Sequence, residues 1–244
     1  LSVVSQRYQV VQPSAILEFY RDLTEISGFE LETAGVLKGG RKIWALAKTG
    51  QSMALKGNDV TNGYILLATA CDGTLATTAQ FTSIRVVCNN TLAVALANGN
   101  RGVVKVPHNT SFDAQAVKKQ LGISVSAWDE FMYGLKNLSE RKVKPAEAQN
   151  YVWRVFNDGG NKSSTSSSNE RAMAKVMTLF EGGGQGADLS SAKGTAFGLL
   201  NSITEFVDHE RRALNPDNRL DSAWFGQGAA IKQKALDEAL LMIA

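Results

Sequence analysis

The sequence contains few of the residues from which most catalytic and metal centres are built. Its 244 residues include two cysteines, Cys71 and Cys88, and two histidines, His108 and His209. Two thiols within predicted strands are typical of small buried hydrophobic side chains in a reducing compartment, and they favour neither a disulfide framework nor a zinc site. We therefore expect a cytoplasmic protein that uses no metal and no other cofactor.

Long hydrophobic runs are missing as well. A membrane helix needs roughly 20 consecutive apolar residues, whereas the longest apolar run, at residues 63–70, has only the length of a strand. No signal-peptide pattern is visible. The chain opens at Leu1 without a methionine, so the position of its natural start is left open. We expect no membrane partner.

The common motifs of nucleotide-binding and hydrolytic enzymes are also missing. The glycine runs at residues 182–186 and 226–228 fit neither the dinucleotide fingerprint nor the phosphate-binding loop of nucleotide hydrolases. No Gly-x-Ser-x-Gly elbow and no cysteine–histidine pairing indicates a nucleophile. The sequence therefore does not predict an enzyme.

Acidic residues are scarce in one part of the chain. Residues 33–58 contain no aspartate or glutamate, and residues 33–112 contain eight basic and two acidic residues, a net charge of +6. The whole chain carries only +3, which leaves −3 for the remainder. Such a concentration of positive charge indicates an anionic partner, either nucleic acid or an acidic protein surface.

A β-hairpin is predicted at the centre of this basic segment. Gly39 and Gly40 separate two runs in which apolar residues recur at every second position, residues 29–33 and 43–47. Glycine accepts the positive φ that a tight hairpin turn requires. The predicted turn and return strand carry most of the basic residues of the segment.

The first half of the chain reads as mainly β. A helix from Pro13 to Gly28 precedes the hairpin, and a polar link at 51–62 follows it. Strands at 64–70 and 75–88 are joined by a turn at 71–74, so that the sheet has about four strands. Asn89 and Asn90 are expected to cap a short helix at 92–97.

The second half reads as helical. Helices are predicted at 112–121, from Ser126 onward with an apolar stripe, at 145–156, 170–180, 192–212 and 226–243. The serine-rich residues 158–169 are expected to form a flexible insertion. We therefore expect one α+β domain over residues 1–244: a curved antiparallel sheet with a basic β-hairpin, packed on helices (β-rich 1–110), followed by an α-rich C-terminal half (111–244).

Four stretches resemble a family carried by phages and plasmids, the domain of unknown function nine-three-two. They are GRKIWALA at 40–47, FTSIRVVCNNTL at 81–92, GTAFGLLNSITEFVDH at 194–209 and NRLDSAWFGQG at 218–228. The resemblance covers nearly the whole chain and implies a mobile-element protein, but it supplies no catalytic motif. A second likeness lies in element order, which is similar to the β-β-β-α core of the Rad fifty-two and Red beta single-strand annealing proteins.

The basic segment is the candidate site for binding DNA. Lysine and arginine neutralise phosphates and release counterions, and an aromatic ring offers a stacking face for a base. The alternative is a solvated strand face of ordinary lysines with the tryptophan in the core. The candidate DNA-binding residues are Lys38, Arg41, Lys42, Trp44, Lys48, Lys56, Arg85, Arg101 and Lys105.

Arg85 stands out among these residues because it lies in an otherwise apolar strand. A buried arginine must pair with an acid or face a groove. Asn89 and Asn90, which follow it, are candidates for hydrogen bonds to phosphate or bases, although the helix-cap interpretation is favoured for both.

A second stretch resembles an enzyme site. Glu205 and His209 are four residues apart on a predicted helix, with Asp208 beside them, a spacing that permits a metal or an acid–base pair. A zinc or nuclease site needs three or four converging ligands, however, and the only other histidine is His108. A structural role is therefore favoured.

The sequence predicts a protein that binds single-stranded DNA and promotes annealing for a phage or plasmid, as a homo-oligomeric ring or helical filament. Pairing of the exposed strands needs no catalyst. Two alternatives are an inhibitor of a host restriction or defence system, which would use the same basic surface, and a metal-dependent nuclease at Glu205, Asp208 and His209.

Overall fold

The computed structural model describes residues 17–18, 20–22, 25, 28–94, 103–106, 119, 127–157 and 167–244. Their contacts group the chain into two compact units. Unit 1 comprises Leu1–Ser52, Asn62–Ile84 and Ala93–Phe131, and unit 2 comprises Met53–Thr61, Arg85–Leu92 and Met132–Ala244. The units are interleaved along the chain, and their boundaries fall within strands and within one helix.

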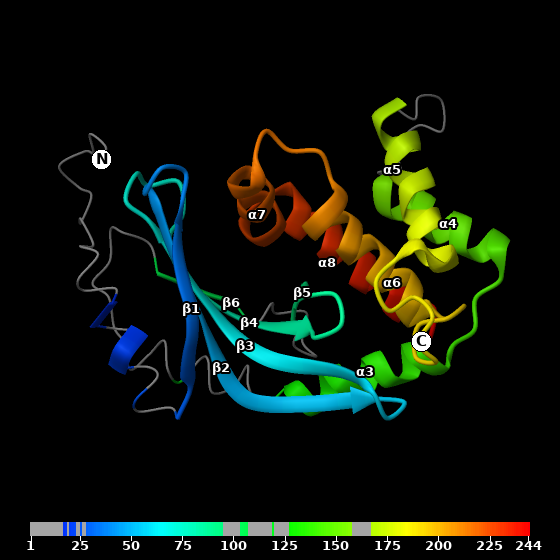
Figure 1. The fold of residues 1–244 in the computed structure, drawn as a ribbon, viewed down its shortest axis with the longest axis horizontal. Helices are drawn as coiled ribbons and strands as arrows, with labels where there is room; N and C mark the ends of the chain where they lie inside the picture. Colours follow the sequence, from blue (N-terminus) through cyan, green and yellow to red (C-terminus); the bar gives the residue numbers. More distant parts are fainter. Residues whose placement is uncertain are drawn as a thin grey trace. The chain divides into compact units, whose positions relative to one another are not determined.

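The fold class is α+β, as the sequence predicts. An open antiparallel sheet has the order β1-β2-β3-β4-β5, and β6 also pairs with β4. The first half of β4 lies beside β6, with Thr77 opposite Val106 and Gln80 opposite Val103. The strands are β1 (Glu30–Leu37), β2 (Lys42–Leu55), β3 (Asp59–Ala70), β4 (Thr77–Arg85), β5 (Asn90–Ala93) and β6 (Val103–Val106) (Figure 1).

The predicted hairpin is confirmed, with a four-residue turn. β1 and β2 pair antiparallel from Glu30 opposite Lys48 to Leu37 opposite Lys42. Gly35 lies opposite Trp44, and a Cβ atom on Gly35 would stand only 2.8 Å from the Trp44 ring. A larger residue at position 35 would therefore displace the indole ring.

Two predictions in the sheet are wrong. The link at 51–62 is not a loop, because β2 continues to Leu55 and β3 begins at Asp59. No helix follows Asn89 and Asn90 directly: Asn89 has a φ of 53° in a turn, and Asn90 begins strand β5. The side-chain amide of Asn90 donates to the Asn201 carbonyl at 3.3 Å instead of capping a helix.

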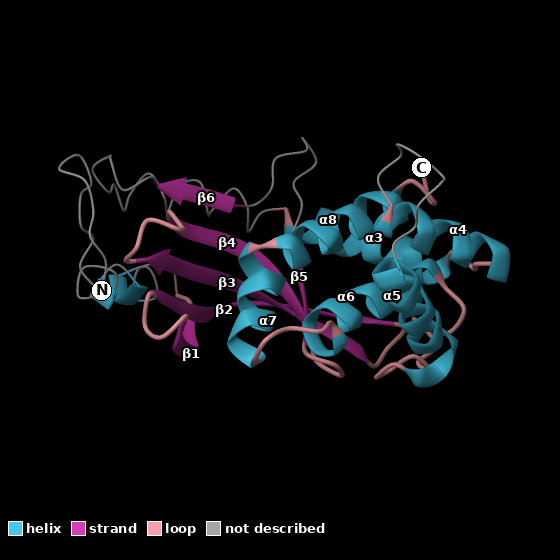
Figure 2. Cartoon of the chain, turned by 90° about the horizontal axis from the view of Figure 1, so that it is seen from above, coloured by secondary structure: helices cyan, strands magenta, loops and turns pink. Residues whose placement is uncertain are grey.

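The helices are α3 (Trp128–Glu140), α4 (Pro145–Phe156), α5 (Ser167–Thr178), α6 (Ala196–Glu205), α7 (Pro216–Phe225) and α8 (Gln227–Leu240), together with π-helical turns η1 (Leu179–Gly183) and η2 (Phe206–Glu210). Figure 2 shows them as cyan coils. The bounds of α4 match the prediction, because Pro145 is suited to the first turn. Helix α7 was not predicted; Asn215 caps it by accepting the Asn218 N–H at 2.8 Å.

Each unit has its own buried core. In unit 1, Phe81 and Trp128 are buried with ring centroids 5.7 Å apart. In unit 2, Tyr151 is buried and its hydroxyl donates to the Ala235 carbonyl at 2.7 Å, joining α4 to α8. The apolar stripe predicted for α3 is buried along its length: Trp128, Phe131, Met132, Leu135 and Leu138.

Several predictions fall where the chain is not described. The insertion expected at 158–169 lies outside the described residues except for its last three, which begin α5. The helix expected at 112–121 is described only at Lys119, which is helical, and residues 95–97 of the helix expected at 92–97 lie outside. None of the helices in the described segments has the length and hydrophobicity that a membrane span requires.

Candidate nucleic-acid interface

The turn of the hairpin presents two basic side chains. Lys38, Gly39 and Gly40 all have positive φ, and the Gly40 N–H donates to the Leu37 carbonyl at 3.2 Å. The Arg41 Nε donates to the Lys38 carbonyl at 3.0 Å, which holds the arginine over its own turn. The Arg41 side chain is 53% exposed, and its Nη1 lies 3.9 Å from the Asp72 carboxylate. At that distance and exposure the pair is weak, so Arg41 remains available to an anion.

The two candidates that follow the turn face inward. Lys42 is only 9% exposed. The Trp44 ring is half-buried and lies against Gly35 on the neighbouring strand. One face of the indole is therefore covered, and the structure does not support Trp44 as an open platform for a base.

Lys48 and Lys56 form ion pairs with acidic residues from other segments. The Lys48 Nζ lies 2.9 Å from the Glu32 carboxylate, which also accepts the Tyr64 hydroxyl at 2.9 Å. The hydrogen bond from Lys48 lowers the pKa of Glu32. Lys56, at the turn between β2 and β3, lies 3.4 Å from Glu140.

The two remaining candidates, Arg101 and Lys105, come last in the sequence of the basic segment. Lys105 is exposed on β6, opposite Thr78 of β4. Arg101 lies outside the described residues. Of these candidates, the structure leaves Arg41 and Lys105 as described side chains that are neither buried nor within 3.5 Å of a carboxylate in the described ion pairs.

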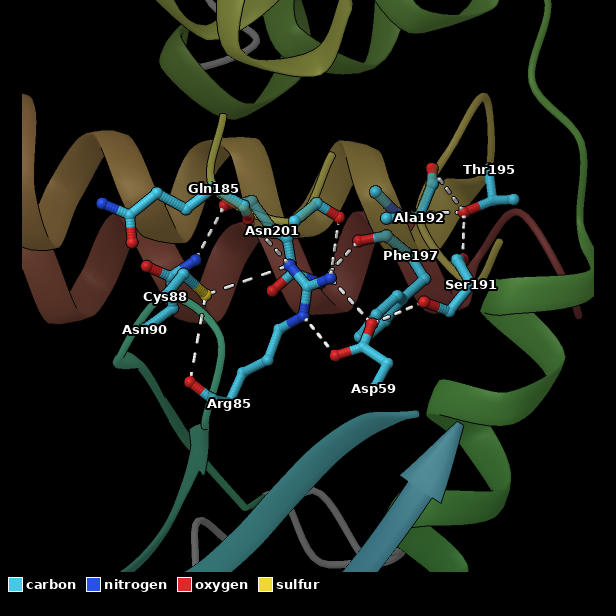
Figure 3. A network of polar contacts seen from close by, with 12 residues as sticks. Asp59, Arg85, Cys88, Asn90, Gln185, Ser191, Ala192, Thr195, Phe197 and Asn201 are labelled. Carbon is cyan, nitrogen blue, oxygen red and sulfur yellow. Dashed lines mark hydrogen bonds and ion pairs between the residues drawn. The ribbon is translucent and has the colours of Figure 1, made fainter. Parts of the chain in front are cut away.

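Arg85 is the centre of a buried polar network in unit 2 (Figure 3). Its Nε and Nη2 each donate to one oxygen of the Asp59 carboxylate at 2.7 Å. The arginine is 4% exposed and the aspartate is fully buried. Ser191 donates its hydroxyl to the same carboxylate at 2.5 Å.

The loop that follows η1 occupies the other side of the guanidinium. The carbonyls of Gln185 and Gly186 accept from Arg85 at 3.4 and 3.1 Å, and the Phe197 ring centroid lies 5.3 Å from the guanidinium carbon. Gly186 has a φ of 71°, and a Cβ there would stand 2.8 Å from Val87. Only glycine therefore brings this carbonyl so close.

Because of this network, we no longer expect Arg85 to contact DNA. Sequence analysis left two options, pairing with an acid or facing a groove, and the structure shows pairing. A guanidinium that already donates to a carboxylate and two carbonyls has no fork left for a phosphate.

The carboxylates of the enzyme-like stretch also have structural partners. Glu205 is buried and accepts the Gln185 N–H at 3.0 Å. Asp208 accepts the Thr91 N–H and the Lys232 ammonium, each at 2.7 Å, while His209 is exposed. Glu205 thus binds the loop after η1, whereas Asp208 binds β5 and α8. Within the described ranges no three His, Cys, Asp or Glu residues gather as a metal site would require.

The structure also reveals a basic cavity that sequence analysis did not predict. It has a volume of about 980 Å³ and lies in unit 2 between α4, α5, η2 and α8. The bases come from positions 171 to 234, where acids separate them along the chain, so no window of sequence stands out as positive. The local signals are the spacing of Arg171 and Lys175 by four residues and the adjacent Arg211 and Arg212. The charged lining residues of this basic cavity are Arg171, Lys175, Glu210, Arg211, Arg212 and Lys234.

Comparison with known proteins gives a family but no activity. No curated protein and no solved structure matches the chain, so the likeness in element order to the annealing proteins gains no support. The model of one family, a domain of unknown function, matches residues 1–224 of the 244. Because this match spans nearly the whole chain, the protein belongs to the DUF932 family.

Proposed function

We propose that this protein binds single-stranded DNA and promotes strand annealing for a phage or plasmid. The observation that carries the proposal is the hairpin turn, where Lys38 and Arg41 stand on a hydrogen-bonded loop within a stretch, residues 33–58, that has no acid of its own. A phosphate backbone approaching this turn meets positive charge from side chains whose backbone is already fixed.

The exposed ion pairs of the segment are consistent with this role. The side chains of Lys48 and Glu32 are both more than 40% exposed. Exposed pairs of this kind contribute about 0–1 kcal/mol, so exchange of the carboxylate for a phosphate costs little. DNA binding would then release Lys48 from Glu32 and add it to the cations that contact the phosphates.

The edge of the sheet supports self-association. Among the described strands, β1 pairs only with β2 and forms the end of the sheet order. Leu31 and Val36 on this strand are 52% and 59% exposed. An open edge with exposed apolar residues is a template for pairing with a second copy. Assembly into a ring or filament would align the hairpin turns and hold a long strand extended.

The same edge favours one alternative, an inhibitor of a host defence protein. Apolar residues beside basic ones on an exposed strand also fit a protein partner that adds its own strand. A strand of DNA does not need the apolar side chains, so the two functions predict different ligands for the same face.

Fluorescence anisotropy with a labelled single-stranded oligonucleotide tests the proposal. Affinity should fall steeply with salt, with a log–log slope of roughly 0.7 per phosphate contact. Multi-angle light scattering should report a mass several times the 26.3 kDa of one chain. A monomer that does not bind DNA at low salt would favour the inhibitor.

A further inference from the structure

The basic cavity combines an apolar floor with a cationic rim. Phe156 of α4 and Phe206 of η2 line it, with ring centroids 5.8 Å apart at an angle of 80°. Ile231 of α8 also lines it. Basic side chains from α5, α8 and the segment after η2 complete the wall. The volume of about 980 Å³ is in the range of small-molecule sites.

The charges of this cavity are not balanced by the residues that the structure describes. Glu210 is the one acid of the described lining, and Lys175 pairs with it at 3.2 Å. Arg171 and Arg212 are exposed and form no ion pair or hydrogen bond with any described residue. Two arginines therefore border a concave surface without a partner among the described residues.

Among the described residues, the groups that hold the Arg211 side chain are neutral. Its Nη1 donates to the Ser222 hydroxyl at 2.9 Å and its Nη2 to the Gln227 side-chain oxygen at 2.5 Å. Burial lowers the pKa of Arg211. The Arg219 Nε donates to the Arg211 carbonyl at 3.0 Å and fixes its backbone. The Arg211 guanidinium is thus partly desolvated and fixed in position. No carboxylate among the described residues neutralises its charge.

A smaller cavity of about 340 Å³ adjoins the first and shares three of its residues, Arg211, Arg212 and Gln227. Arg219 lines this second cavity, and none of its lining residues is acidic. The positive charge therefore continues past Arg211, as a ligand with more than one anionic group would require.

We propose that the basic cavity binds the phosphate of a nucleotide. Arginine is suited to this task because its planar guanidinium donates two parallel hydrogen bonds to phosphate oxygens. Arg171, Arg211 and Arg212 would hold the phosphate, and the apolar floor at Phe156 and Phe206 would take the base. Side chains alone make this site, so the missing glycine-rich motif does not argue against it.

The phosphate has two possible sources, a free mononucleotide and the phosphorylated end of a DNA strand. The inference does not depend on DNA binding at the hairpin, because every lining residue lies in unit 2 and none lies in β1 or β2. Failure of one proposal leaves the other standing.

Isothermal titration of the full chain with ADP, adenosine and inorganic phosphate tests the site. The informative variant is Arg171→Gln with Arg212→Gln, since both side chains are exposed and their loss should leave the fold intact. The matched control is Lys136→Gln with Lys193→Gln, two exposed lysines of unit 2 outside the cavity. A 5′-phosphorylated oligonucleotide and its unphosphorylated copy form the second arm. Circular dichroism confirms folding of each variant.

The expected result is that ADP binds the wild type and the control, and that the double arginine variant weakens binding by about tenfold or more. Adenosine should not bind. If ADP fails but the 5′-phosphate strengthens oligonucleotide binding in the wild type and not in the arginine variant, the source is a strand end. Equal behaviour of the arginine variant and the control with both ligands would overturn the proposal, as would a failure of both ligands to bind.

Discussion

Arg85 and Asp59 form a two-pronged ion pair in which Nε meets Oδ1 and Nη2 meets Oδ2, each at 2.7 Å. Both side chains are buried, so each charge depends on the other. Asp59→Ala should lower the free energy of unfolding by about 3–5 kcal/mol, because it leaves an uncompensated buried arginine. Urea denaturation measures the loss.

Two further variants show whether burial of the ion pair is the cause of this large loss of stability. The double variant Asp59→Leu with Arg85→Met removes both charges and should cost less than Asp59→Ala alone. Lys48→Met breaks the exposed pair with Glu32, which solvent screens, and should therefore cost far less than Asp59→Ala. Equal losses from the buried and exposed pairs would contradict the explanation.

The hairpin turn is expected to control DNA affinity without controlling stability. Lys38 has a φ of 55°, where glycine is less strained. Lys38→Gly with Arg41→Gln removes two charges and should reduce the salt slope of DNA binding by roughly 1.4, at about 0.7 per contact. Anisotropy over a salt series measures the slope.

The melting temperature of this variant should not fall, since Lys38→Gly relieves strain. Lys136→Gln with Lys193→Gln is again the matched control and should leave the slope unchanged. Substitution of Lys42 by glutamate is not informative, because Lys42 is buried and the change would test folding instead. An unaltered slope in the turn variant would exclude the turn from the interface.

The two cysteines are expected to differ in reactivity. Burial raises the pKa of the Cys88 thiol to about 11, whereas Cys71 is half-buried. Since the thiolate is the reactive form, iodoacetamide near neutral pH should label Cys71 first and Cys88 only on unfolding. Mass spectrometry of time points distinguishes the two sites.

The raised pKa also has a consequence for stability. Between the ordinary thiol pKa and about 11, the unfolded chain loses the Cys88 proton and the folded chain keeps it. This contribution is fully present below the ordinary pKa and is lost as pH rises through the folded value. Cys88→Ala should therefore show a shallower alkaline loss of stability than the wild type.

Asp208 and His209 are neighbours with opposite expected effects. Asp208→Asn leaves the buried Lys232 without its counter-charge and should cost about 3–5 kcal/mol. His209 is exposed, so His209→Ala should stay within about 0.5 kcal/mol. Thermal and urea denaturation compare them. A loss of stability for His209→Ala, or none for Asp208→Asn, would contradict this assignment.

Protonation of Lys232 makes the Asp208 prediction dependent on pH. Burial lowers the pKa of Lys232, and Asp208 partly restores it. Without Asp208 the folded chain holds the Lys232 proton less firmly than the unfolded chain does. Stability of Asp208→Asn should therefore rise more than that of the wild type as pH rises toward the ordinary lysine pKa.

Local signals in the sequence were enough to predict the hairpin and α4. A glycine pair between two period-2 runs specifies a turn whatever surrounds it, and Pro145 begins α4 because its missing N–H costs nothing in the first turn. The α3 stripe was equally readable, since Met132, Leu135 and Leu138 recur on one helical face and are buried.

Some of the errors involve partners that are distant in sequence. Asn90 resembled a helix cap, but its amide meets the carbonyl of Asn201, and Arg85 is matched by an aspartate in another strand. The basic cavity was invisible for the same reason: Arg171 and Arg212 become neighbours only when α5 and η2 pack. For these residues, the distance between partners along the sequence limited the prediction, rather than a weak local propensity.

The interleaved units have a consequence for inheritance. Asp59, Arg85 and Thr91 belong to unit 2 although they precede its helices by tens of residues. A gene fragment that begins at Met132 would encode Ser191, Asp208 and Lys232 without Asp59 and Thr91, which bind these three residues. Recombination at a single breakpoint after Phe131 therefore keeps unit 1 whole but divides unit 2, which requires the chain from Met53 onward.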